Sequence, residues 1–148
     1  MTIQENYSDR QDEGRAGDVA NTEISNLISR TVETEDGIEF AKVVERGALD
    51  NTCKAFAGGK PLGIVARQRS MDAQSPNKFK QNSEARICTV GVIRVNAAVA
   101  VNQGDQVYVV NADGTLSNVD TDATEYPNAV WDSSTTEAGL ASIALNVR

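Results

Sequence analysis

Residues 86–119 read RICTVGVIRVNAAVAVNQGDQVYVVNADGTLSNV, and this stretch decides the fold. Its first part is rich in β-branched residues, and residues 106–110 are rich in Val and Tyr, which suits strands on a half-buried pleated surface. Residues 102–105 predict a turn between these runs, and residues 111–114 supply the Asp-Gly pair that is typical of a tight hairpin. None of these side chains is an obvious catalyst. We therefore expect a small β-barrel or sandwich that acts through its surfaces rather than through a pocket.

The rest of the chain is predicted to form short strands separated by turns. Segment 19–35 fits both a helix and a strand, and the extended alternative is favoured. Polar loops are expected over 70–84 and, with acidic side chains, over 120–127. Strands are expected over 38–46, 52–57, 62–69, 129–132 and 141–147, with a turn over 133–139. Short strands with turn signals about ten residues apart predict an all-β fold.

The expected strand 38–46 has apolar side chains on both faces. Ile38, Phe40 and Val44 should point one way, whereas Ala41 and Val43 should point the other way. Both faces of this strand are therefore expected to be at least partly covered.

The N-terminal residues differ in composition from the rest of the chain. Residues 1–18 contain almost no large apolar side chains, so burial cannot offset the entropy cost of ordering them. We expect residues 1–18 to be an extended polar arm and residues 19–148 to be a single all-β domain.

The composition excludes several classes of function. The 148 residues suffice for one domain, and the formal net charge of −7 argues against nucleic-acid binding, which needs a surplus of Lys and Arg. The chain has no histidine, which removes the usual general base and the commonest transition-metal ligand. We expect no enzyme activity, no cofactor and no metal.

Several local motifs resemble sites but lack the required spacing. Asp120, Asp122 and Glu125 form an acidic loop without apolar neighbours that would raise a carboxyl pKa. With Asn111 and Asp113, these aspartates do not have the spacing of a calcium loop. Residues 58–60, Gly-Gly-Lys, lack the remainder of a phosphate-binding loop and should be a turn.

The two cysteines and the polarity of the chain bear on its environment. Cys53 and Cys88 fall in predicted strands and are expected to be free, buried thiols. No segment has the length of a membrane span, and the N-terminus is polar and acidic, so we expect no secretion signal and no membrane anchor.

Basic residues gather around the long polar loop of an otherwise acidic protein. They are Arg67, Arg69, Lys78, Lys80 and Arg86. This pattern fits an ordinary mixed surface, and it also fits a protein contact between complementary charged patches.

Four motifs, taken in order, resemble the bacteriophage capsid decoration proteins, also called structural cement proteins. The pattern V-x-x-G-D-x-V-Y-V at 101–109, followed by D-G-x-L at 113–116, resembles a strand–turn–strand repeat of that family. The segments GIEFAKVVERG at 37–47, PLGIVA at 61–66 and GLASIAL at 139–145 resemble three further family strands. The resemblance covers residues 14–148. Ala41 stands where the family commonly has glycine.

The resemblance implies a role in the virion. It implies a protein made in the host bacterial cytoplasm that binds the outer surface of the assembled major capsid protein lattice and stabilises the shell. It also implies self-association, as a homotrimer, without nucleic-acid or membrane partners. The side chains expected at protein interfaces are Tyr7, Arg10, Arg15, Arg67, Arg69, Lys78, Phe79, Lys80 and Arg86.

An alternative function belongs to a different class. A carbohydrate- or receptor-binding β-module of a phage tail or cell surface would need exposed aromatic side chains. The candidates for this role are Tyr7, Tyr126 and Trp131.

Overall fold

The computed structural model describes residues 14–68 and 77–147, and this part of the chain contains eleven strands and no helix. The expected all-β class is confirmed. The strands are β1 (Asn26–Val32), β2 (Ile38–Glu39), β3 (Val43–Arg46), β4 (Thr52–Ala55), β5 (Pro61–Val65), β6 (Lys78–Phe79), β7 (Glu84–Ala97), β8 (Gln106–Val110), β9 (Leu116–Ser117), β10 (Ala123–Trp131) and β11 (Gly139–Leu145).

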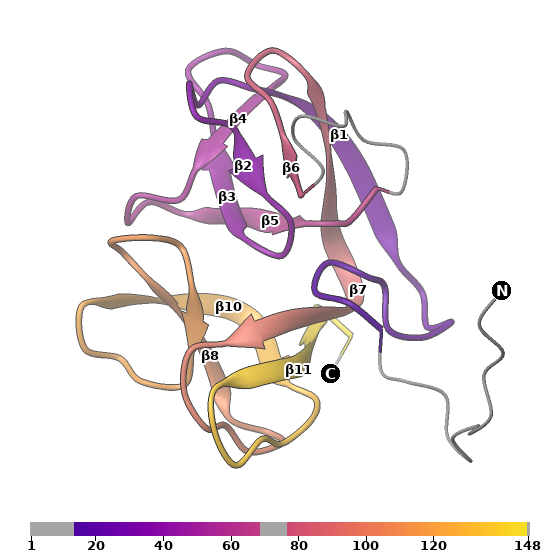
Figure 1. Cartoon of the computed structure of the whole chain (residues 1–148), viewed down its shortest axis with the longest axis vertical. Coiled ribbons are helices and arrows are strands. Elements are labelled where there is room, and N and C mark those ends of the chain that lie inside the picture. Colours follow the sequence, from indigo (N-terminus) through magenta and orange to yellow (C-terminus); the bar gives the residue numbers. More distant parts are fainter. Residues whose placement is uncertain (1–13, 69–76, 148) are drawn as a thin grey trace, which may run out of the picture.

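Nine of these strands form one continuous sheet that closes on itself twice. Its order is β1-β4-β3-β5-β7-β11-β10-β8-β9, and β7 also pairs with both end strands, β1 and β9. The result is two five-stranded barrels that share β7, the first built with β1, β3, β4 and β5 and the second with β8 to β11. Figure 1 shows the first barrel at the top, the second at the bottom, and β7 running between them. The prediction of a barrel is therefore confirmed.

β7 changes partners at its midpoint. Its first half pairs with β1 and β5, and its second half pairs with β11 from Gly91↔Leu145 to Ala97↔Gly139. The register of β1 shifts between Asn26 and Leu27, opposite this crossing. Gly91 has a φ of +130°, which L side chains rarely adopt, so glycine allows the strand to pass from one barrel into the other.

Two hydrophobic cores fill the barrels. Every strand of the first barrel contributes to one core, which Ile38, Phe40 and Phe79 complete. The other core draws on all five strands of the second barrel and also on outward-facing residues of the first, among them Val43 and Ile64. This second core therefore joins the barrels into one body. Neighbouring residues of β3, β5 and β7 alternate between the cores: Val43 and Val44, Ile64 and Val65, Cys88 and Ile87.

The expected strand 38–46 has the predicted faces but is interrupted. Ile38, Phe40 and Val44 lie in the first core, and Ala41 and Val43 lie in the second. The segment divides into β2 and β3 because Ala41 has a φ of +65°, which breaks the extended conformation. The position where the resembled family commonly has glycine is thus one that needs a left-handed backbone.

The expectation of a polar loop over 70–84 is wrong for Lys78 and Phe79, whereas residues 80–83 form a turn as expected. Lys78 and Phe79 form β6, which pairs with β2, and Glu84 begins β7. The Phe79 side chain is only 3% exposed and packs edge-to-face on Phe40, with ring centroids 5.4 Å apart. Burial of this one aromatic side chain holds an otherwise polar segment against the core.

The expected acidic loop over 120–127 is also wrong in its second half. β10 already begins at Ala123, and Tyr126 is buried on the inner side of that strand while Glu125 faces solvent. Trp131 is fully buried, and its indole N–H donates to the Ser117 carbonyl at 3.2 Å. These two aromatic side chains are therefore not available to a sugar or receptor ligand. Tyr7 lies outside the described residues.

Other local predictions are confirmed. Segment 19–35 is extended where it forms β1, although the strands expected over 52–57 and 62–69 end early, at Ala55 and Val65. Both turn glycines, Gly104 and Gly114, have positive φ. Cys53 and Cys88 are free and buried, and burial raises the pKa of the Cys53 thiol to about 11.

Gly91→Ala should destabilise the protein through the crossing point of β7. A Cβ at this position would lie 2.9 Å from the Ser25 Cβ, and the backbone φ is unfavourable for alanine. We expect the free energy of unfolding, measured in urea, to fall by about 1–3 kcal/mol. Gly139→Ala is the matched control, because its added Cβ meets nothing within 4 Å. Equal stability of the two variants would contradict this role for Gly91.

Ala41→Gly tests the strained position between β2 and β3. The substitution removes a buried methyl group, worth about 0.8 kcal/mol, but relieves a left-handed conformation that costs alanine about 1–2 kcal/mol. We expect unfolding in urea to show unchanged or increased stability. Ala144→Gly removes an equally buried methyl group from β11, where φ is not positive, and should destabilise by about 1 kcal/mol. A loss at Ala41 as large as that at Ala144 would contradict the argument.

Candidate protein-interface site

A groove lined by arginine side chains lies beside β7, where residues 14–20 pack on the domain. Its volume is about 550 Å³. Two undescribed segments of the chain, 1–13 and 69–76, end or begin within a few residues, in sequence, of residues that line this groove. The lining residues are Gly17, Asp18, Val19, Ala66, Arg67, Gln68, Arg86 and Arg94.

Backbone hydrogen bonds hold residues 17–20 along the second half of β7. The Gly17 N–H donates to the Arg94 carbonyl at 2.7 Å, and the Ala20 N–H donates to the Val92 carbonyl at 2.8 Å. Val19 forms an antiparallel bridge with Ile93. This segment therefore covers an edge of β7 that β1 has left. The end of the expected arm, residues 14–18, thus contacts the domain, while residues 1–13 lie outside the described part.

Arg67 positions this segment as well as lining the groove. Its Nε donates to the Ala16 carbonyl at 3.1 Å, and its guanidinium lies 4.9 Å from the centroid of the Phe40 ring. Its backbone N–H donates to the Gly17 carbonyl at 2.8 Å. Such stacking and hydrogen bonding leave less of Arg67 available to a partner.

Arg86 and Arg94 supply the other positive charges of the groove, which Asp18 also lines. Arg86 is exposed, and its Nη1 donates to the Arg67 carbonyl at 3.2 Å. Arg94 is a groove residue that the sequence analysis did not single out. The strand alternation does give a signal for Arg94. Its neighbours Ile93 and Val95 are buried, so the Arg94 side chain must face outward from β7.

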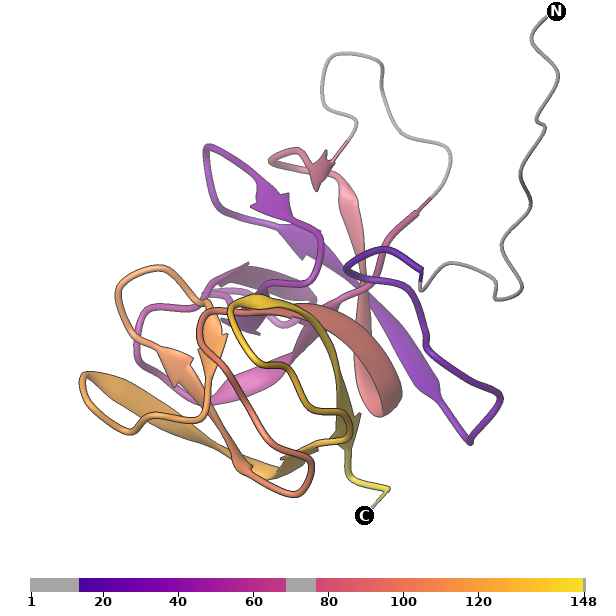
Figure 2. The same cartoon turned by 60° about the horizontal axis from the view of Figure 1, so that its bottom comes forward.

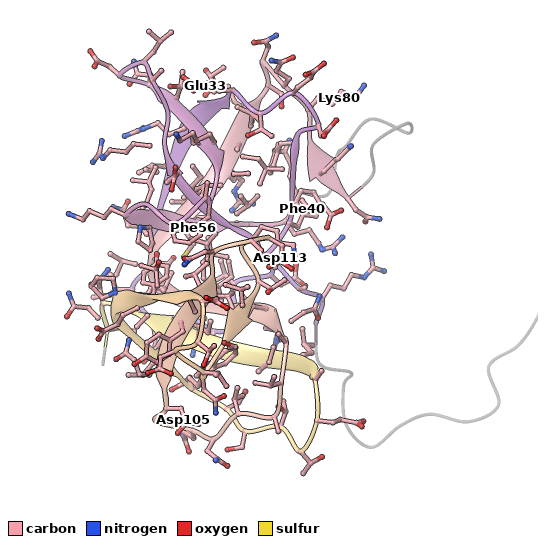
Figure 3. All side chains as sticks on the ribbon, turned by 90° about the vertical axis from the view of Figure 1, so that its left-hand side faces the viewer. Glu33, Phe40, Phe56, Lys80, Asp105 and Asp113 are labelled. Carbon is pink, nitrogen blue, oxygen red and sulfur yellow. The ribbon has the colours of Figure 1, made fainter. Side chains whose placement is uncertain are left out.

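The remaining residues expected at interfaces do not join one patch. Lys78 borders a different hollow of about 330 Å³, with Asp36, Lys42 and Asp113, and its Nζ donates to the Asp36 carbonyl at 2.8 Å. Arg15 is exposed, and Figure 3 labels Lys80 at the upper end of the first barrel. Phe79 belongs to the core of the chain itself, so it is removed from the interface set. Tyr7, Arg10 and Arg69 lie outside the described residues.

The chain divides sharply in charge near the end of β7. Residues 95–147, which contain β8 to β11, include no Lys or Arg. In contrast, residues 14–68 and 77–94 carry eleven Lys or Arg against nine Asp or Glu. In the view of Figure 3, Asp105 lies at the lower end of the second barrel and Asp113 lies near Phe56, between the barrels. The acidic residues of 95–147 are Asp105, Asp113, Asp120, Asp122, Glu125, Asp132 and Glu137.

Two of these carboxylates stabilise turns. Hydrogen bonds from the Asn118 side chain and the Asn102 backbone N–H lower the pKa of Asp105. The Thr115 hydroxyl and backbone N–H likewise lower the pKa of Asp113. Both carboxylates therefore keep their negative charge while they fix the connections around β8 and β9.

The Gly-Gly-Lys segment is a turn that its own chain already occupies. Glu45, only 7% exposed, accepts hydrogen bonds from the Gly59 N–H at 3.0 Å and the Ala57 N–H at 3.3 Å. Lys54 lies 3.3 Å from the same carboxylate. A phosphate would have to displace this internal anion, so the turn does not serve as a phosphate site.

The described residues contain no metal-binding cluster and no exposed thiol. Within 14–68 and 77–147, no group of three or more His, Cys, Asp or Glu side chains is placed to hold a metal ion. This part of the chain also contains no helix that is long and apolar enough to cross a bilayer. The two thiols are buried, and burial raises the pKa of each, which makes them poor nucleophiles.

The chain matches one protein family over nearly all of its length. The model of that family, described as structural cement protein (E217 gp24/Pam3 gp6), matches residues 3–146. The chain belongs to the phage structural cement proteins. It is therefore a structural component of a phage capsid.

Solved structures of two phage proteins resemble this cement protein in fold. A chain from "The capsid of Myoviridae Phage XM1" superposes with a TM-score of 0.76 at 18% identity, covering 99% of both chains. The head fiber gp8.5 N base of bacteriophage phi29 gives a TM-score of 0.51 at 11% identity, covering 82% of this chain and 94% of that one. None of the curated proteins matches the sequence.

Another surface feature of this cement protein is the turn between β3 and β4, which exposes Leu49. The Glu33 carboxylate accepts hydrogen bonds from the Ala48 N–H at 2.9 Å, the Leu49 N–H at 3.3 Å and the Thr52 hydroxyl. These bonds, the Thr52 hydroxyl first among them, lower the pKa of Glu33. Leu49 is 71% exposed at the tip of this turn, so Glu33 fixes an apolar projection at one end of the first barrel.

The lowered pKa of Glu33 predicts a pH dependence of stability. Because the folded pKa lies below the unfolded one, the contribution of Glu33 is present above the unfolded pKa of about 4.3 and is lost as pH falls through the folded pKa. Glu33→Gln should therefore lower the urea unfolding midpoint at pH 7 and flatten its decline between about pH 5 and pH 3. Glu137→Gln, at an exposed carboxylate on the other barrel, controls for net charge. A decline as steep in Glu33→Gln as in the wild type would contradict the assignment.

Proposed function

We propose that this cement protein binds the outer surface of the assembled major capsid protein lattice and stabilises the shell, associating with itself as a homotrimer. The family match over residues 3–146 is the observation that carries the proposal. The resemblance to a chain from the capsid of phage XM1 supports it at the level of fold. We further propose that the protein has no catalytic activity and no nucleic-acid partner, in keeping with its net charge of −7.

Stabilisation follows from binding that depends on assembly. A subunit that binds the closed lattice, and not the free capsid protein, lowers the free energy of the closed lattice at each occupied site. Many such sites act together, and contacts that bridge neighbouring capsid subunits add an effective-concentration advantage. A rigid scaffold suits this task, because little conformational freedom is lost on binding.

The contacts proposed for this role lie on exposed elements around the scaffold. They are Arg15, Lys78, Lys80 and Arg86 in the described residues, with Tyr7, Arg10 and Arg69 outside them. Arg67 would act by holding residues 14–18 in place, since it bonds Ala16 and Gly17. Residues 1–13 would serve as an anchoring arm.

The test uses particles of the encoding phage that were assembled without this protein. Purified protein should bind the assembled particles, but not free major capsid protein, and should raise the temperature at which the particles release their genome. Copies bound per particle are counted by gel densitometry after sedimentation. No binding to assembled particles, or equal binding to free capsid protein, would overturn the proposal.

A deletion variant separates anchoring from folding. Removing residues 1–13 should leave the thermal midpoint of the free protein nearly unchanged, because the described barrels and cores begin after this segment. Occupancy on particles should fall. A large drop in the thermal midpoint would show instead that the arm belongs to the folded domain.

A further inference from the structure

The arginine groove and the acidic start of β10 lie on opposite sides of the molecule. The arginine groove is formed with residues 14–20, drawn in indigo, and Figures 1 and 2 both place this segment away from the orange connection that leads into β10. Asp120, Asp122 and Glu125 on and beside that connection are exposed. Three arginines thus face one way, and three carboxylates, in a stretch (residues 95–147) without any Lys or Arg, face another way.

We propose that the acidic start of β10 in one copy docks against the arginine groove of the next copy. This inference rests on the proposed self-association and identifies the contact that makes it. Guanidinium groups recognise carboxylates through paired, charge-assisted hydrogen bonds, which supplies the chemical fit. The occupant is a second copy of this chain because the same sequence carries both complementary surfaces.

Charge also selects the symmetry of this contact. A two-fold dimer places the same patch of both copies together, and two surfaces on opposite sides of one copy cannot both belong to that patch. Through the groove, that arrangement would oppose Arg86 and Arg94 to themselves, and through the other surface it would oppose carboxylates to carboxylates. Like charges in contact are unfavourable, so the complementary pairing is head-to-tail. A head-to-tail contact closes into a ring such as a trimer when its rotation permits, and otherwise grows into a filament.

The docking side chains are accessible and their removal should not unfold the chain. Asp120 and Glu125 are exposed, and so is Arg86; Gln68 is half-buried at the lip of the groove. Arg67 and Arg94 are less suitable for substitution, because Arg67 packs on Phe40 and Arg94 lies against Gly14 and Asp18. Asp122 has a φ of +52°, so it is also left unchanged.

Charge reversal on each surface, followed by both reversals in one chain, tests the pairing. The acid-side variant is Asp120→Lys with Glu125→Lys, and the groove variant is Gln68→Glu with Arg86→Glu. Each should weaken self-association at least about tenfold in analytical ultracentrifugation of the free protein. The chain that carries all four substitutions should recover association, because the introduced lysines of one copy then meet the introduced glutamates of the next copy.

Controls separate this contact from general charge effects. Asp50→Lys changes an exposed carboxylate on the turn between β3 and β4 and should leave association unchanged. Circular dichroism and thermal unfolding establish that each variant is folded. Raising the salt concentration should weaken association of the wild type and of the four-substitution chain alike, because screening acts on either polarity.

Each contrary result has a definite meaning. Wild type that remains monomeric, reversals without effect, or a folded four-substitution chain that stays dissociated would each overturn the contact. A groove variant that still self-associates but no longer binds particles would show that the groove receives the capsid protein, which also overturns it. The contact between copies can fail while wild type still binds assembled particles, and the proposed capsid-binding function then stands. If the copies associate as expected but bind no particles, the proposed capsid-binding function fails.

Discussion

β7 forms hydrogen bonds along both edges over most of its length, and the two barrels close only because it does so. Its first half has β1 on one side and β5 on the other, and its second half has β11 on one side and residues 17–20 on the other, with β9 completing the ring at Ala97. Closed rings leave few unpaired strand edges, which protects the protein from unwanted edge-to-edge pairing. Gly91 lies at the crossing, where the residue must tolerate a positive φ and the close approach of Ser25. The geometry of both barrels, and the separation of their surfaces, depends on this strand.

Local patterns predicted those parts of the fold in which a strand's own residues carry the information. Segment 38–46 is the clearest case, because its two apolar faces enter two different cores, as the alternation of Ile38, Phe40 and Val44 with Ala41 and Val43 indicated. The interruption at Ala41 could not be seen, since alanine gives no sign of a left-handed backbone. Phe79 and Tyr126 were missed for a related reason. Each stands alone in a polar stretch, and tertiary burial outweighed the local composition.

The sequence predicted the part of the candidate interface that lies close together along the chain, and it missed the part that tertiary contacts bring together. Arg67 and Arg86 were placed together because they flank one segment, and the structure brings both to the groove. Arg94 was missed because it joins them through the pairing of residues 17–20 with β7, a contact that sequence separation conceals. Ring closure is likewise non-local, since β1–β7 and β7–β9 pairings join distant segments. Lys78 lies near these arginines in sequence but borders another hollow, because β6 turns back to pair with β2.

The sharing of one strand and one core also fixes the charged surfaces relative to each other. The hairpin at Gly114 approaches Phe56 and Val43 of the first barrel, and the core that contains Trp131 extends to Ile64, so the barrels have little freedom to pivot. A cation-free stretch, residues 95–147, attached rigidly to the segments that form the arginine groove presents charge in a fixed direction. Such a pattern discriminates between orientations of a partner, because a wrong orientation places like charges together. A structural protein can in this way encode the orientation of a partner in the placement of charge on a closed backbone.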